Sequence, residues 1–169
     1  MTAKISEDQR GLERPGHRTL RLRKILAPID FSPASKNAFK YAIRFAEEFG
    51  GELTLLHVLE PESMTGFMAI PEATAFVESD IIAAGKNLRS LIASVRHDKI
   101  ERPHWKVRAG LPSHEIVEAA KEMDVDLIVI ATHGYTGWKH FCIGSTAERV
   151  VRAAPCPVLV VREKEHEFC

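Results

Sequence analysis

The sequence predicts an α/β fold in which helices cover both faces of a five-stranded parallel sheet, and three observations carry this prediction. Short apolar runs alternate with segments whose apolar residues recur at helical spacing. The strand-like runs are apolar almost throughout, which is typical of parallel strands buried on both faces. A helical segment separates each strand from the next, as in β-α-β units. A chain of 169 residues is long enough for one such domain.

The first strand and the first helix have the clearest boundary signals. Residues 24–29, KILAPI, form a short apolar run and predict the first strand. Ser32 and Pro33 favour a helix start, because the hydroxyl can cap the first turn and proline suits the first helical position. Gly50 and Gly51 predict the end of this helix.

The middle of the chain predicts a strand, a long helix and a strand near the sheet edge. Residues 52–59, ELTLLHVL, are expected to form the second strand, and a helix is expected from Pro71 to about Val95. Residues 104–110, HWKVRAG, alternate as a less buried strand. The buried face of the long helix is expected to comprise Val77, Ile81, Ala84, Leu88, Leu91, Ile92 and Val95.

The last part of the chain repeats the alternation twice. Helices are expected at 112–123 and 145–154, and strands at 125–131 and 157–161. The last strand, PVLVV, would lie at a sheet edge, and an unpaired apolar edge favours pairing with another chain. Pairing of Pro157 to Val161 across a two-fold axis would make a homodimer.

Composition and charge exclude several classes of protein. The 23 basic and 23 acidic residues balance, which disfavours nucleic acid as a partner. No apolar run approaches the roughly 18–20 residues that a membrane span needs, and the polar N-terminus lacks the apolar centre of a secretory signal. Three cysteines without a CxxC pair are typical of a reducing compartment, so we expect a cytoplasmic protein. Residues 1–23 predict a mobile tail, 24–162 a folded domain and 163–169 a C-terminal tail.

Two loops are expected to flank a ligand-binding crevice. Five parallel strands commonly take the order 3-2-1-4-5, and ligands bind where the order reverses, between strands one and four. The loop after strand one begins at Asp30, and the loop after strand four, ATHGYTGWKHFCIGS, begins at Ala131. Both loops would therefore lie at the same point of the sheet.

The second of these loops favours a bound anion over a simple turn. Gly134 and Gly137 let backbone amides approach a ligand closely, and Gly144 opens the last helix, where free N–H groups favour an anion. The alternative is that Ser145 and Glu148 form a capping box, which needs no ligand. A capping box leaves the long glycine-bearing loop before it unexplained.

Other polar residues near these loops have simpler interpretations. His57 is expected to be a hydrogen-bonded core histidine rather than a base, and Asp30 could help to cap the first helix. His133 and His140 lack a third ligand, so we expect no metal site made by the protein itself. The sequence contains neither a Walker lysine nor a Gly-x-Ser-x-Gly elbow, and we assign no catalytic residue.

The glycine loop resembles the nucleotide-binding signature of the universal stress protein family. That signature reads Gly, two residues, Gly, nine residues, then Gly and Ser or Thr. Here Gly134, nine residues and Gly144-Ser145 match it, while Ala131 replaces the first glycine. The segments ILAPIDFSPAS, LTLLHVLEP, DLIVIATHG and APCPVLVVR extend the resemblance over about residues 24–162. The resemblance implies a Rossmann-like, adenine nucleotide alpha hydrolase-like fold and a stress-response protein that binds ATP or AMP.

The resemblance also implies a set of nucleotide-binding residues. In ATP-binding members of the family, the residue matching Asp30 lies in the adenosine pocket, Pro28 lines that pocket, and the backbone of Val58 meets adenine. A Mg or Mn ion, where present, is held through the phosphates. The groups that hold ribose and phosphates would be Ala131, Thr132, His133, Gly134, Tyr135, Thr136, Gly137, Gly144, Ser145 and Thr146.

The expected role is that of a regulatory nucleotide-binding protein. Backbone cradling binds substrate and transition state about equally, so we expect slow ATP hydrolysis at most. One alternative is a nucleotide-free family member that acts through protein contacts, which the replacement at Ala131 keeps open. Another is an adenosine-handling enzyme similar to the electron-transfer flavoproteins, but the sequence suggests neither a second cofactor site nor a catalytic pair.

Overall fold

Five parallel strands form the centre of the computed structural model, which describes residues 21–60, 73–96, 99, 101–132 and 143–162. The strand order is β3-β2-β1-β4-β5, which confirms the order expected from the sequence. Each neighbouring pair of strands is parallel. The strands are β1 (Lys24–Pro28), β2 (Glu52–Leu59), β3 (His104–Ala109), β4 (Leu127–Ala131) and β5 (Val158–Val161).

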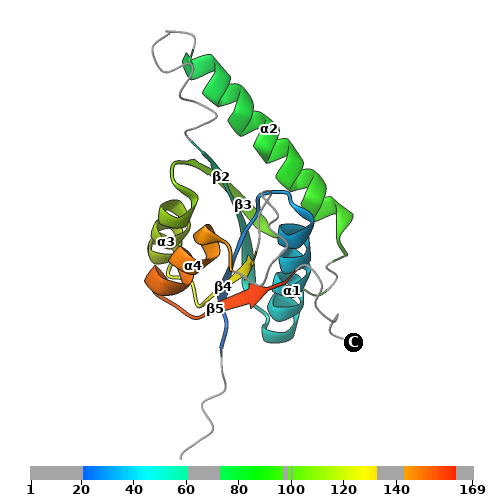
Figure 1. Cartoon of the computed structure of the whole chain (residues 1–169). Helices are drawn as coiled ribbons and strands as arrows, with labels where there is room; N and C mark the ends of the chain where they lie inside the picture. The colour runs from blue at the N-terminus through cyan, green and yellow to red at the C-terminus, as the bar shows by residue number, and fades with distance from the viewer. Residues whose placement is uncertain (1–20, 61–72, 97–98, 100, 133–142, 163–169) are drawn as a thin grey trace, which may run out of the picture.

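Helices cover both faces of the sheet, as predicted (Figure 1). Helices α1 (Pro33–Phe49) and α2 (Ala73–Ser94) pack on one face, and α3 (Pro112–Met123) and α4 (Ser145–Ala153) pack on the other. Alternate residues of β1 therefore enter different cores: Ile25 joins the α1–α2 side and Leu26 the α3–α4 side. Burial on both sides explains why the strands are apolar almost throughout.

Helix α1 begins and ends at the predicted signals. The Ser32 hydroxyl accepts a hydrogen bond from the Ser35 N–H at 3.1 Å, and Pro33 occupies the first helical position. Gly50 takes a left-handed conformation with φ of 65°, and its N–H donates to the Ala46 carbonyl. Both ends of α1 are therefore determined by local sequence.

The expected buried face of α2 is correct only in its second half. Ala84, Leu88 and Ile92 are buried against the sheet, whereas Ile81 is 40% exposed, so its predicted burial is wrong. The first part of α2 extends past the end of the sheet, so this part of the helix has no strand to pack against (Figure 1). Leu91 and Val95 pack against the core while half-buried, and the side chain of Val77 lies outside the described residues.

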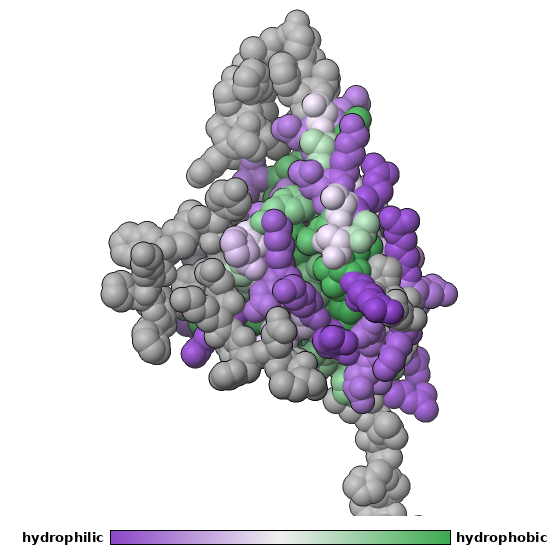
Figure 2. All heavy atoms as spheres, turned by 90° about the vertical axis from the view of Figure 1, so that its right-hand side faces the viewer, coloured by the Kyte–Doolittle hydropathy of each residue, from purple (hydrophilic) through white to green (hydrophobic). Residues whose placement is uncertain are grey.

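The two outer strands are less buried than β1 and β4: β3 is exposed or half-buried, and β5 is half-buried up to the buried Val161. On β3, the Trp105 ring packs against Gly85 of α2, and the Arg89 guanidinium lies 5.4 Å from the ring centroid. The surface on the side of α1 and α2 is mainly polar, with apolar side chains gathered near its middle (Figure 2). No helix within the described ranges has the length and apolar character that crossing a membrane requires.

Candidate functional site

A cavity of about 430 Å³ opens at the carboxyl end of the sheet, between the loops that follow β1 and β4. Its volume falls in the range of roughly 300–1,000 Å³ that is usual for small-molecule sites. The strand order reverses at this point, so the cavity lies where the sequence predicted a crevice. The predicted site residues that line it are Pro28, Asp30, Val58, Ala131, Thr132, Gly144, Ser145 and Thr146.

Some predicted site residues cannot be located in this crevice. His133, Gly134, Tyr135, Thr136 and Gly137 lie outside the described residues, as does His140. Conversely, sequence reasoning missed several lining residues. The carboxyl end of β3 lies at the same edge of the sheet, which is the signal that could have placed the start of α3 there. The missed lining residues include Ser35, Glu60, Pro112 and Ile116.

The start of α4 differs from the capping box that the sequence left open as the alternative to an anion site. Gly144 is the capping residue and Ser145 is the first helical residue, so the Ser145 side chain makes no cap hydrogen bond. Glu148 pairs with Arg152 at 2.9 Å instead of reaching back to the helix start. The capping box is therefore wrong, because the extended backbone of Gly144, with ψ of 151°, starts the helix one residue earlier.

Gly144 also links the start of α4 to the end of β4. Its N–H donates to the Thr132 carbonyl at 2.6 Å, and the Thr132 N–H donates to the Val161 carbonyl at 2.8 Å. The first intrahelical bond runs from the Glu148 N–H to the Gly144 carbonyl. Within the described part of the chain, the N–H groups of the three residues 145–147 donate no hydrogen bond, and all three residues line the crevice.

Asp30 stands at the opposite wall of the crevice. Its Oδ1 accepts hydrogen bonds from the Ser32 N–H at 3.0 Å and from the Ser32 hydroxyl at 2.6 Å. Asp30 thus supports the cap of α1 through Ser32 rather than capping the helix itself. Its Oδ2 accepts no hydrogen bond from the described residues, so half of this carboxylate is available to a ligand.

His57 has the hydrogen bond that the sequence predicted for a core histidine. The ring is half-buried, and its Nδ1 donates to the Ile29 carbonyl at 2.7 Å. The ring also packs on Phe31, with 4.7 Å between the two ring centroids. These contacts involve the residues on both sides of Asp30, Ile29 and Phe31.

The side chains of Ala131 and Val58 both pack with the core. Ala131 is 9% exposed and belongs to the buried cluster on the α1–α2 side of the sheet. The methyl group that replaces a glycine of the family signature is therefore accommodated among apolar residues. Val58 packs against the opposite cluster, as expected for a strand residue whose backbone alone would meet a ligand.

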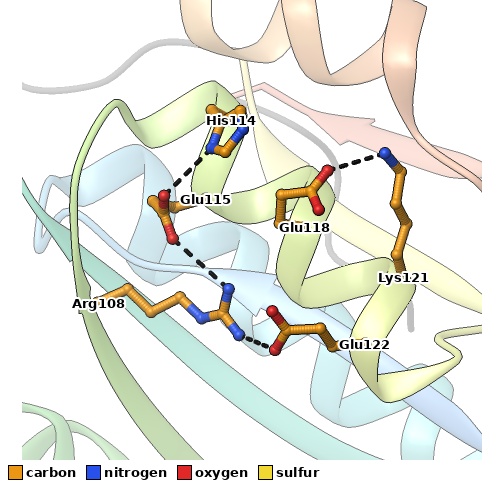
Figure 3. Close-up of polar contacts among 6 residues, drawn as sticks. All are labelled: Arg108, His114, Glu115, Glu118, Lys121 and Glu122. Atoms are coloured by element: carbon orange, nitrogen blue, oxygen red, sulfur yellow. Dashed lines mark hydrogen bonds and ion pairs between the residues drawn. The ribbon is translucent and has the colours of Figure 1, made fainter.

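Charged side chains fix the wall that α3 contributes. Arg108 of β3 contacts Glu115 at 3.5 Å and forms an ion pair with Glu122, so it bridges two turns of α3 (Figure 3). Hydrogen bonding to Glu122 raises the pKa of Arg108. Because Pro112 and Ile116 of the same helix line the crevice, these ion pairs hold one of its walls in place.

The described residues include no group of three or more His, Cys, Asp or Glu side chains that could hold a metal ion. The described crevice also lacks a nucleophile next to a base. His57, the histidine that lines it, uses Nδ1 to donate to a backbone carbonyl. The described residues are therefore suited to binding through backbone N–H groups and two carboxylates, those of Asp30 and Glu60.

Comparisons with known proteins match almost the whole described domain. A family model described as the universal stress protein family matches residues 21–162. Universal stress protein MJ0531 of Methanocaldococcus jannaschii is 34% identical over 146 residues, which cover 86% of this chain and 85% of that protein. Universal stress protein YxiE of Bacillus subtilis is 32% identical over 145 residues, which cover 82% of this chain and 98% of that protein.

A solved structure gives the same result for the fold. The structure of protein MJ0577, from the same archaeon, matches this chain with a TM-score of 0.76 at 26% sequence identity. The match covers 87% of this chain and 100% of that one. The likeness therefore extends over the sheet and its covering helices.

Proposed function

The chain belongs to the universal stress protein family, and we propose that its crevice binds an adenine nucleotide, ATP or AMP, in a regulatory role in the stress response. The proposal starts from the family resemblance of the glycine loop and depends on the chemistry of the described crevice. The site is proposed to comprise the predicted residues that line the crevice together with the loop residues 133–137.

The start of α4, which has no side-chain cap from the described residues, is the observation that carries the proposal. Three consecutive residues that line the crevice, Ser145, Thr146 and Ala147, have N–H groups without a partner among the described residues. The helix dipole adds a partial positive charge at the same end, and together these features favour a phosphate group. At a helix start such donors are satisfied by a capping side chain, by water or by a ligand, and the capping residue Gly144 has no side chain to do so.

The acidic side chains of the crevice give the ligand a direction. Asp30 and Glu60 line the wall away from α4, and carboxylates repel phosphate but accept hydrogen bonds from hydroxyl and amino groups. The phosphates are therefore proposed to lie at α4, with ribose and adenine toward Asp30 and the Val58 backbone. This direction agrees with the roles that the family resemblance implies.

The residues of the crevice also bear on how a metal ion would be held and on how fast ATP would be hydrolysed. Because the described residues hold no metal-ligating cluster, a Mg or Mn ion is proposed to be held through the phosphates. Because the described residues of the crevice include no base at the start of α4, hydrolysis is proposed to be slow at most. The proposed location is the cytoplasm, in keeping with a cysteine content typical of a reducing compartment.

A second candidate function, in which the protein acts through protein contacts, is favoured by the surface beside β5. Val151 on α4 is 46% exposed, and β5 is an edge strand. Exposed apolar side chains beside an unpaired edge favour pairing with another chain. We propose a homodimer through Pro157 to Val161, which is compatible with a nucleotide in the crevice at the opposite side of β4.

A pair of substitutions at Ser145 tests the role of the α4 N–H groups. Ser145→Pro removes one of these donors while keeping the helix, because proline fits the first helical position and the Gly144 backbone, with φ of −59° and ψ of 151°, suits a residue before proline. Ser145→Ala keeps the N–H and removes only the hydroxyl. In calorimetric titration with Mg-ATP, Ser145→Pro should bind about tenfold more weakly than Ser145→Ala. Equal affinity of the two folded variants would contradict the proposal.

A further inference from the structure

The carbonyl group of Ile29 has an unusual partner just past the end of β1. The Ile29 N–H donates to the Leu56 carbonyl at 2.8 Å, which continues the ladder between β1 and β2 by one step. In a parallel ladder, the next bond would run from the Val58 N–H to the Ile29 carbonyl. The donor found there is the His57 ring, whose Nδ1 lies 2.7 Å from the carbonyl oxygen.

The ring therefore replaces a backbone ladder bond at the point where the two strands separate. A carbonyl oxygen only accepts, so Nδ1 carries the hydrogen in both the neutral and the charged ring. Among the described residues, the Val58 N–H makes no hydrogen bond with the Ile29 carbonyl, so this N–H can donate to another acceptor. Because Val58 lines the crevice, a ligand can supply that acceptor.

The same ring also supports a strained residue. Phe31 has φ of 65°, a left-handed conformation that is rare for a bulky side chain and that persists only where the surroundings impose it. The His57 ring packs on the Phe31 ring at a centroid distance of 4.7 Å. His57 therefore contacts both neighbours of Asp30, the residue whose Oδ2 is available to a ligand.

We propose that His57 is a positioning residue for the crevice: it ties the end of β1 to β2, holds Asp30 in place and leaves the Val58 backbone to the ligand. The identity of that ligand as an adenine nucleotide rests on the function proposed above. The hydrogen bond from His57 to the Ile29 carbonyl and the ring contact with Phe31 exist without ligand, so their effect can be measured in the nucleotide-free protein.

Three substitutions separate the contributions of the ring. His57→Phe keeps a ring against Phe31 but loses the donor. His57→Asn places an amide N–H near the position of Nδ1, and His57→Gln places it near the position of Nε2. Leu88→Ala is the control, because it destabilises the buried core under α2 at a residue that does not line the crevice.

Two readouts are taken from each variant. Hydrogen exchange of the Ser32 amide, which donates to Asp30 Oδ1, reports the loop without ligand. Calorimetric titration with Mg-ATP measures the affinity of the crevice for the nucleotide. We expect His57→Phe to speed Ser32 exchange about tenfold and to weaken binding about tenfold, and His57→Asn to restore both toward the wild type.

Each alternative outcome overturns the inference or identifies which proposal fails. An unchanged exchange rate of the Ser32 amide in His57→Phe, or an equally fast rate in Leu88→Ala, would show that His57 does not hold the loop around Asp30 locally. Rescue of binding by His57→Gln and not by His57→Asn would show that the ring contacts the ligand itself, which also overturns the positioning role. If the wild type gives no titration heat, the proposed function fails. The exchange rate of the Ser32 amide still shows whether His57 holds Asp30 in place.

Discussion

Removal of the Asp30 carboxylate should lower the unfolding free energy, and the hydrogen bonds that Asp30 accepts indicate by how much. Oδ1 accepts two hydrogen bonds from Ser32, at 3.0 Å from the N–H and 2.6 Å from the hydroxyl. Ser32 is 2% exposed, so water has little access to replace the lost acceptor in Asp30→Ala. A buried donor left unpaired costs about 1–3 kcal/mol, and we expect Asp30→Ala to lose about 2 kcal/mol of unfolding free energy.

The Ser32 hydroxyl cannot simply find another partner. It also accepts the Ser35 N–H at 3.1 Å, so turning it away would weaken the cap of α1. Asp30→Asn keeps an oxygen in the Oδ1 position and should stay within about 1 kcal/mol of the wild type. For a domain of this size, the alanine variant should therefore melt about 4–8 °C lower.

Thermal unfolding by circular dichroism, with and without Mg-ATP, checks both parts of this prediction. The asparagine variant should melt near the wild type alone but gain less from the nucleotide, because it presents an amide where the ligand meets a carboxylate. An alanine variant as stable as the wild type would refute the reasoning on Ser32. An asparagine variant as unstable as the alanine variant would show that charge, and not acceptor geometry, stabilises the loop.

Other predictions concern the fold, the thiol and the assembly. Gly51→Ala should destabilise more than Gly50→Ala in urea unfolding, because a Cβ at Gly51 overlaps the Leu22 carbonyl oxygen, whereas at Gly50 it meets open space and only the left-handed backbone opposes it, at about 1 kcal/mol. Burial raises the pKa of the Cys156 thiol, so iodoacetamide should alkylate it more slowly in the folded than in the urea-unfolded chain, as read from its peptide by mass spectrometry. The same shift leaves stability unchanged at neutral pH and lowers it above about pH 8.5, where the unfolded thiol ionises. Light scattering should give twice the chain mass of 18.9 kDa, and a monomer at micromolar concentration would contradict the dimer.

Sequence reasoning predicted the features that depend on local signals and on strand order. The cap at Ser32 and the left-handed Gly50 are determined within a few residues, and the structure has both. Apolar strands separated by helices were sufficient for the parallel sheet, while the crevice also required the strand order that is common in such folds, and the structure has both. Predicting these features does not require the relative lengths of neighbouring helices and strands.

The failures concern information that neighbouring residues do not contain. Periodicity predicts which face of α2 is apolar, but not how far the sheet extends beneath it, and Ile81 of that face is exposed. The pair Ser145 and Glu148 left a capping box open as the alternative to an anion site, and the sequence did not show that Gly144 has the extended backbone that starts the helix. Pro112 and Ile116 line the crevice because the end of β3 lies at the same edge of the sheet, which the predicted parallel sheet implied, but the reach of α3 toward the crevice depends on tertiary packing.

The most direct test of the central claim is to identify the nucleotides released when the purified protein is denatured, by mass spectrometry, together with titration of the nucleotide-free protein with Mg-ATP. The account predicts about one ATP or AMP per chain, or saturable binding at about one site per chain. A protein that releases no nucleotide and gives no titration heat at several temperatures would contradict it. The second candidate function, action through protein contacts at the surface beside β5, would then be favoured.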